Sequence, residues 1–182
     1  LKLDAEVNLD GSLVDLAIDA QLDRGSGLIN ADINFGSLKP KLLSGVAPIT
    51  KHIQGIDIAL NGHTSIVAST ALDIEKIAFE FNGGPGELSF QELFPQTPSL
   101  IVSNLRAAGV LKPISQTLTL EKIFIDLGNS TINVDASVEG EWLKPKIKAN
   151  ILIENLPISR IDEAWPPTLA INAREWVTSR IS

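Results

Sequence analysis

Residues 1–9 read LKLDAEVNL, with an apolar side chain at every odd position and a polar one at every even position. A period of two is typical of a β-strand that buries one face, because successive side chains point to opposite sides of the strand. The dipeptide Asp10-Gly11 follows, and Asp-Gly is a strong signal for a tight hairpin turn. The opening of the chain therefore predicts two antiparallel strands that share one apolar face.

The same alternation returns along most of the chain. It predicts further strands over 14–22, 29–35, 56–60, 64–72, 77–81, 88–90, 100–108, 116–127, 131–139 and 146–154. Asn61-Gly62, residues 82–86 and Gly128-Asn129 are interpreted as turns between strands. Residues 36–55 break the pattern and predict a crossing segment with short helical turns. We expect a mainly β fold, in which antiparallel hairpins form a curved, groove-like sheet.

The C-terminal residues have a different period. Pro166-Pro167 interrupts the chain, and Leu169, Ala173, Trp176 and Val177 then recur at helical spacing. We expect two regions, a curved β-sheet over 1–156 and a short helical end over 157–182. Residues 29–41 and 132–146 resemble each other, which predicts an internal repeat or reflects chance similarity between two strands. The absence of Met predicts that the chain is a fragment of a longer protein.

The composition excludes several classes of function. The net charge of −7, without a long basic cluster, argues against nucleic acid as a partner. There is no Cys, and His52 and His63 lack the spacing of metal ligands, so we expect neither a metal site nor a cofactor. No motif of a nucleophile, a phosphate loop or a catalytic triad occurs, and we expect a protein that is not an enzyme.

The apolar side of the expected strands is the candidate site. Its members are large aliphatic or aromatic residues at alternate positions. They are Ile29, Ile33, Phe35, Phe79, Phe81, Leu118, Leu120, Ile123, Ile125, Ile132, Val134, Ile151 and Ile153. A face of this size needs a cover, because large exposed apolar patches mark binding surfaces. A second sheet would make a closed β-sandwich, acyl chains would make a lipid groove, and an exposed strand edge would bind a protein partner.

The C-terminal residues carry a resemblance to a known family. Leu156-Pro157-Ile158, Trp165-Pro166 and Ala173-Arg174-x-Trp176-Val177 resemble the AsmA-like bacterial envelope proteins, in particular the YhdP-type branch. The resemblance implies a β-lined groove that carries phospholipid through the periplasm and serves outer-membrane biogenesis. It also implies an inner-membrane anchor outside these residues. No catalytic residue is transferred, and we expect Trp165 and Trp176 to anchor the terminal helix on the sheet.

Overall fold

The computed structural model describes residues 1–43, 53–89, 99–141, 144–157, 172 and 179. They form ten β-strands and one 3₁₀ turn, η1 (Pro40–Leu43). The strands are β1 (Lys2–Leu9), β2 (Ser12–Asp23), β3 (Leu28–Leu38), β4 (Ile56–Ser69), β5 (Ile74–Leu88), β6 (Leu100–Val102), β7 (Asn104–Lys112), β8 (Thr117–Asp126), β9 (Thr131–Glu139) and β10 (Lys146–Glu154).

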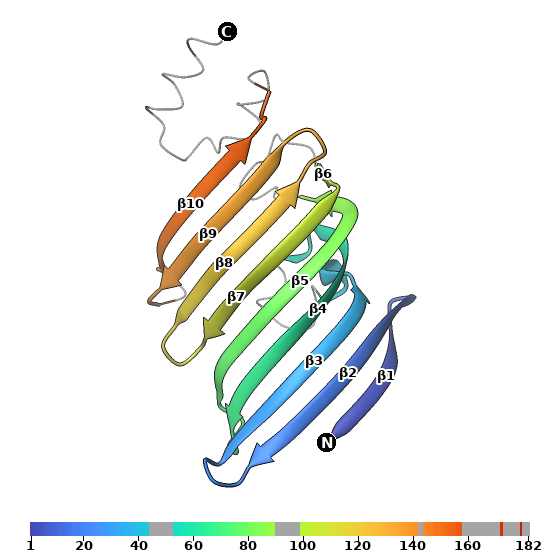
Figure 1. Cartoon of the computed structure of the whole chain (residues 1–182), viewed down its shortest axis with the longest axis vertical. Helices are drawn as coiled ribbons and strands as arrows, with labels where there is room; N and C mark the ends of the chain where they lie inside the picture. Colours follow the sequence, from blue (N-terminus) through green and yellow to red (C-terminus); the bar gives the residue numbers. More distant parts are fainter. Residues whose placement is uncertain (44–52, 90–98, 142–143, 158–171, 173–178, 180–182) are drawn as a thin grey trace.

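All ten strands belong to one antiparallel sheet, whose order follows the chain from β1 to β10. The short strand β6 is the exception, because it pairs with the end of β5 beside β7. Figure 1 shows the sheet as a twisted, open layer in which β1 and β10 form the two edges. The expected mainly β, antiparallel fold is confirmed, and apart from β6 the strands that are consecutive in the chain are neighbours in the sheet.

Two turns expected from the sequence are wrong. Asn61-Gly62 lies inside β4, and residues 82–86 lie inside β5. The register pairs Asn61 with Asn82 and Gly62 with Phe81, so the two signals stand opposite each other in mid-sheet. The glycines there permit close approach of neighbouring strands: a Cβ on Gly62 would lie 2.6 Å from the Glu80 carbonyl oxygen.

Other boundaries differ less. The strand expected over 100–108 is divided into β6 and β7. A helical turn expected near Lys41 is present as η1, and Gly128-Asn129 connects β8 with β9 as expected. The first repeat block spans β3 and η1, and the second spans β9 and the start of β10. The helix expected over 157–182 falls almost wholly outside the described residues, as do Trp165, Pro166, Arg174 and Trp176.

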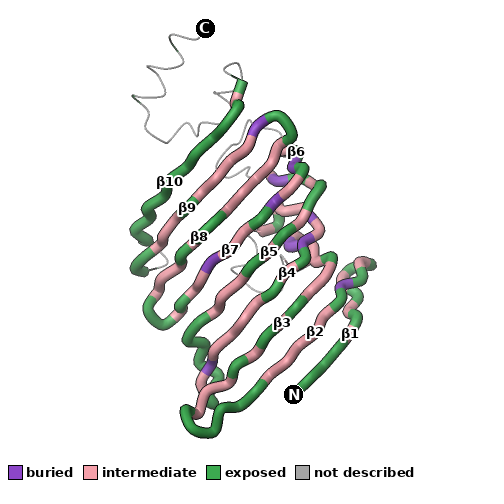
Figure 2. Tube along the Cα trace, viewed as in Figure 1, coloured by how far each residue is buried: buried purple, intermediate pink, exposed green. Residues whose placement is uncertain are grey.

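The buried core is small and lies at one end of the central strands, near β6. It consists of residues from β4, β5, β6 and β7, with Phe35, Phe81 and Ile123 among the half-buried residues packed against it. The buried members are Ile58, Leu60, Leu88, Val102 and Leu105. Figure 2 shows most of the buried positions gathered near β6, while the greater part of the sheet is half-buried or exposed.

Candidate apolar binding face

Strand register brings all of the candidate residues to one side of the sheet. Directly paired residues of antiparallel strands share a face, so the side of each residue follows from its partners. One row reads Ile18, Ile33, Thr64, Phe79, Gly109, Leu120, Ala136 and Ala149 from β2 to β10. The next rows contain Phe35, Phe81, Ile123, Val134 and Ile151, and then Ile125, Ile132 and Ile153. We call these positions, together with the paired row through Ile29 and the row through Leu118, the apolar face.

A bulge in β8 keeps this face continuous. The register between β8 and β9 shifts between Leu120 and Ile123, where two residues separate the paired positions instead of one. The extra residue restores the alternation, so Leu120 and Ile123 point to the same side although their numbers differ by three. Simple odd–even counting along β8 would have sent one half of the strand to the wrong face.

The apolar face carries no charged side chain along the described rows, and Thr64 is their one hydroxyl. Most of the candidate residues are half-buried: they touch neighbours in the sheet, and no second sheet of described strands lies over them. Ile151 and Ile153 on β10 are more open, with 56% and 36% of their surface exposed. The sheet thus presents a broad, uncharged, partly uncovered surface.

Three phenylalanines occupy the middle of the face. The ring centroids of Phe79 and Phe81 are 4.8 Å apart in a stacked arrangement, and those of Phe35 and Phe81 are 5.8 Å apart. The Phe35 ring on β3 reaches the Phe81 ring on β5 across β4, because β4 has Gly62 at the position paired with both residues. A Cβ on Gly62 would lie 2.8 Å from Phe35 Cζ, and one on Gly109 would lie 2.8 Å from Phe79 Cζ. The glycines therefore make room for a continuous aromatic surface, a role that the sequence interpretation missed.

The opposite side of the sheet is polar, and it holds a cluster that the sequence interpretation also missed. His63 Nδ1 lies 3.1 Å from Asn34 Oδ1, and His63 Nε2 lies 3.0 Å from Ser65 Oγ and 3.4 Å from Asp32 Oδ1. The Ser65 hydroxyl donates to Asp32, so its hydrogen is directed away from His63. In an activated serine nucleophile, the hydroxyl group donates its hydrogen bond to the general base. The hydroxyl group of Ser65 donates to Asp32 instead, so the cluster is an exposed polar network. These residues are brought together by the register of β3 with β4, and no sequence motif predicts the cluster.

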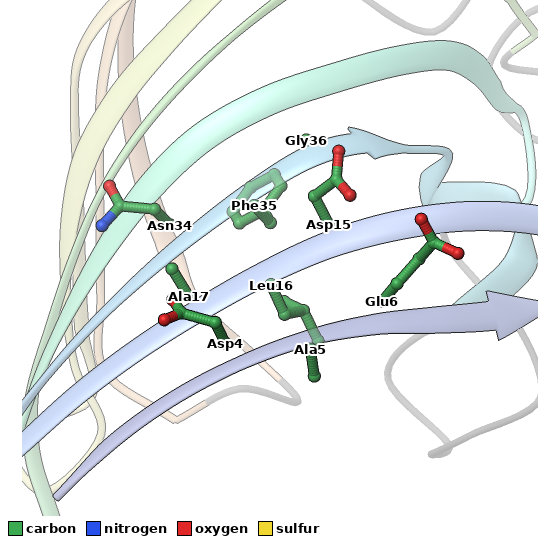
Figure 3. Close-up of a pocket in the computed structure, with 9 residues that line it drawn as sticks. All are labelled: Asp4, Ala5, Glu6, Asp15, Leu16, Ala17, Asn34, Phe35 and Gly36. Carbon is green, nitrogen blue, oxygen red and sulfur yellow. The ribbon is translucent and has the colours of Figure 1, made fainter.

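A shallow depression lies on the polar side of β1, β2 and β3. Asp4 pairs with Ala17 and Ala17 with Asn34, while Glu6 pairs with Asp15 and Asp15 with Gly36. Figure 3 shows the Asp15 and Glu6 carboxylates on the same side of the strands. The small side chain of Ala17 and the bare Gly36 create the hollow between longer polar neighbours. Among the residues that the structure describes, no group of three or more His, Cys, Asp or Glu could hold a metal ion.

Ion pairs join the residues that follow β3 to the start of β4. Lys39 Nζ lies 3.1 Å from Asp57 Oδ1, and Lys41 Nζ donates to the other carboxylate oxygen. Hydrogen bonds from Lys41 and then Lys39 hold the pKa of the Asp57 carboxyl below its ordinary value. In the turn between β2 and β3, hydrogen bonds from the Ser26 hydroxyl and the Gly25 amide lower the pKa of Asp23 in the same way.

Comparison of the chain with known protein families, with curated proteins and with solved structures found no match. Within the described ranges, no helix has the length and apolar character required to cross a membrane.

Proposed function

We propose that this chain is a segment of a lipid conduit, in which the apolar face shields the acyl chains of phospholipids. The observation that carries the proposal is the unbroken register of uncharged side chains from β2 to β10, half-buried at most positions. Surfaces of this kind mark binding sites for apolar partners. The resemblance of the C-terminal residues to the AsmA-like, YhdP-type proteins supports a phospholipid as that partner.

The dimensions suit acyl chains. Eight strands stand side by side from β2 to β10 along the sheet order, and at ~4.8 Å per strand spacing the face extends ~34 Å. The hydrocarbon core of a bilayer is ~30 Å thick and contains two leaflets, so one acyl chain covers roughly 15 Å of that depth. The apolar face is therefore about two acyl chains long, and a lipid can move along it without leaving an apolar surface.

The chemistry favours transfer over tight capture. Each methylene removed from water contributes about 0.8 kcal/mol of binding free energy, and this contribution does not depend on the orientation of the acyl chain on the surface. Because the described rows offer no charged group to fix a headgroup, a bound lipid keeps similar contacts as it shifts by one strand. The headgroup stays in water beyond the strand ends. The proposal includes the periplasm as the location and an inner-membrane anchor elsewhere in the full-length protein, both of which rest on the resemblance.

The closed β-sandwich is the competing proposal. It requires a second sheet over the apolar face, whereas every described strand belongs to the same sheet. A sandwich core would also bury large apolar residues completely, as Ile58 and Val102 are buried at 0% exposure. Ile147 and Ile151, at 65% and 56%, lack such a cover.

Extraction of the purified protein with organic solvent, followed by lipid mass spectrometry, tests the proposal. We expect phospholipid at a reproducible molar ratio in the native chain and none in a Phe79→Asp variant, because a carboxylate in the centre of the face penalises acyl chains. Ile151→Asp and Leu152→Asp form a matched pair, since these residues are adjacent in β10 and are 56% and 58% exposed. They point to opposite faces, so we expect only Ile151→Asp to lower lipid content.

Circular dichroism of each variant separates loss of lipid from loss of fold. The conduit proposal is wrong if the native chain retains no more lipid than a β-sandwich of similar size. It is also wrong if folded Phe79→Asp retains the native amount. Equal losses in the Ile151 and Leu152 variants would show binding that does not depend on the face.

A further inference from the structure

The strand β10 is an edge of the described sheet, and its residues are unusually exposed. It pairs with β9, and no described strand lies on its other side. All nine of its residues are exposed, whereas the other edge strand, β1, has half-buried residues at Ala5, Val7 and Leu9. An exposed edge presents a row of backbone N–H and C=O groups that can pair with a further strand.

The sequence of β10 is complementary to itself in one antiparallel register. When Asn150 stands opposite Asn150 of a second copy, Lys146 stands opposite Glu154 and Ile147 opposite Ile153 of that copy. The same register sets Ala149 opposite Ile151. Cross-strand pairs of opposite charge and of apolar side chains stabilise antiparallel strands, and every pair in this register except Asn150 with Asn150 occurs twice by symmetry.

This register also explains the place of Leu152. Leu152 lies on the polar side of the sheet, paired with Asn133, and 58% of it is exposed. In the self-paired register its cross-strand neighbour is Lys148 of the second copy. The aliphatic stem of a lysine covers apolar surface while its ammonium group stays in water.

We propose that β10 is a dimerisation edge, at which two copies of this chain pair β10 with β10 antiparallel around a two-fold axis normal to the sheet. A rotation about that axis leaves both apolar faces on the same side. The dimer therefore joins two sheets into one and doubles the length of the apolar face. The proposal does not depend on what the apolar face binds.

Single cysteines test the register directly, because the native chain contains no Cys. Directly paired residues have Cα atoms ~4.5–5.5 Å apart, which is within the reach of a disulfide. We expect Asn150→Cys to form a covalent dimer under mild oxidation. Lys148→Cys is the matched control on the same face of the strand. In this register the two thiols introduced by Lys148→Cys would lie four positions apart, or ~13 Å, and we expect no covalent dimer.

A charge exchange provides the second measurement, by sedimentation at several protein concentrations. We expect Lys146→Glu and Glu154→Lys each to weaken the dimer roughly tenfold, because each places like charges opposite each other twice. The double variant K146E/E154K restores the complementary pairs, and its dimer should regain native strength.

The proposal is overturned if Asn150→Cys remains monomeric, which would mean that the edge is covered by this chain or left unpaired. It is also overturned if the Lys148→Cys variant cross-links as fast as the Asn150→Cys variant, or if the double charge variant is as weak as the single ones. Preferential cross-linking of Asn150→Cys to Asp4→Cys in a mixture would assign the edge to a head-to-tail contact with β1.

Discussion

The end of the central strands near β6 and the edge strand β10 are built from the same alternating pattern and reach opposite states. Near β6, Ile58 and Val102 are completely buried and Leu88 is 2% exposed. On β10, Ile147 and Ile151 are 65% and 56% exposed. The difference arises because β4, β5, β6 and β7 supply packing partners at the first end, and no described strand does so at the second.

This contrast shows what alternation specifies. A period of two assigns a side chain to one face of a sheet, and it carries no information about what lies against that face. A lipid-binding surface and a protein core therefore look alike in sequence. The two can be separated experimentally, because truncating a buried residue and truncating an uncovered one have very different energetic costs.

The largest effect is expected for Ile58→Ala. Removing three carbons from a completely buried isoleucine loses transfer free energy and leaves a cavity, at a cost of about 3 kcal/mol in the free energy of unfolding. Ile147→Ala is the control, since this residue is 65% exposed, and we expect a change below about 0.5 kcal/mol. Chemical denaturation measures both variants. Similar losses at the two positions would mean that the β10 end is packed in solution, and the contrast between the ends would fail.

The sequence predicted most strands because their alternation is a local property. Residues 1–9, 131–139 and 146–154 carry the whole signal within themselves, and the structure confirms each as a strand. The assignment of the candidate residues to one apolar face was also predicted, including Leu120 and Ile123 of β8, although the bulge that places these two on the same side was not. The alternation showed which side chains of each strand share the apolar face, whereas it did not show how far that face is buried.

The errors occurred where a residue has its role through a distant neighbour. Asn61-Gly62 is a local turn signal, yet Gly62 is needed to admit the rings of Phe35 and Phe81 from the adjacent strands. The cluster of Asp32, His63 and Ser65 likewise exists only through the pairing of β3 with β4. Neither the glycine contact nor this cluster can be derived without the register.

An intermediate effect is expected at Gly62, in the middle of β4. A Cβ there would stand 2.6 Å from the Glu80 carbonyl oxygen and within 3 Å of both rings, so Gly62→Ala should cost about 1–3 kcal/mol. Gly36→Ala is the matched control in the adjacent strand. Its nearest contact would be 3.5 Å, and we expect a change within about 1 kcal/mol, of either sign. If thermal denaturation shows equal effects, close packing of the rings over Gly62 is not the reason for the glycine.

The smallest effect is expected from the ion pairs at the packed end, where Lys39 and Lys41 contact Asp57. The pKa of Asp57 is lowered by these lysines, so the folded state binds its proton less readily than the unfolded state. The contribution is then complete above the ordinary pKa of 3.8 and is lost as the pH falls below it.

Because the side chain is 40% exposed, we expect Asp57→Asn to cost less than about 1 kcal/mol at pH 7. Denaturation at pH 7 and pH 2.5 should show a larger difference from the native chain at the higher pH. Asp135→Asn, on the polar side of β9, serves as the control for general charge effects. A difference of equal size at the two pH values would assign the effect of the Asp57 substitution to packing and not to its ion pairs with Lys39 and Lys41.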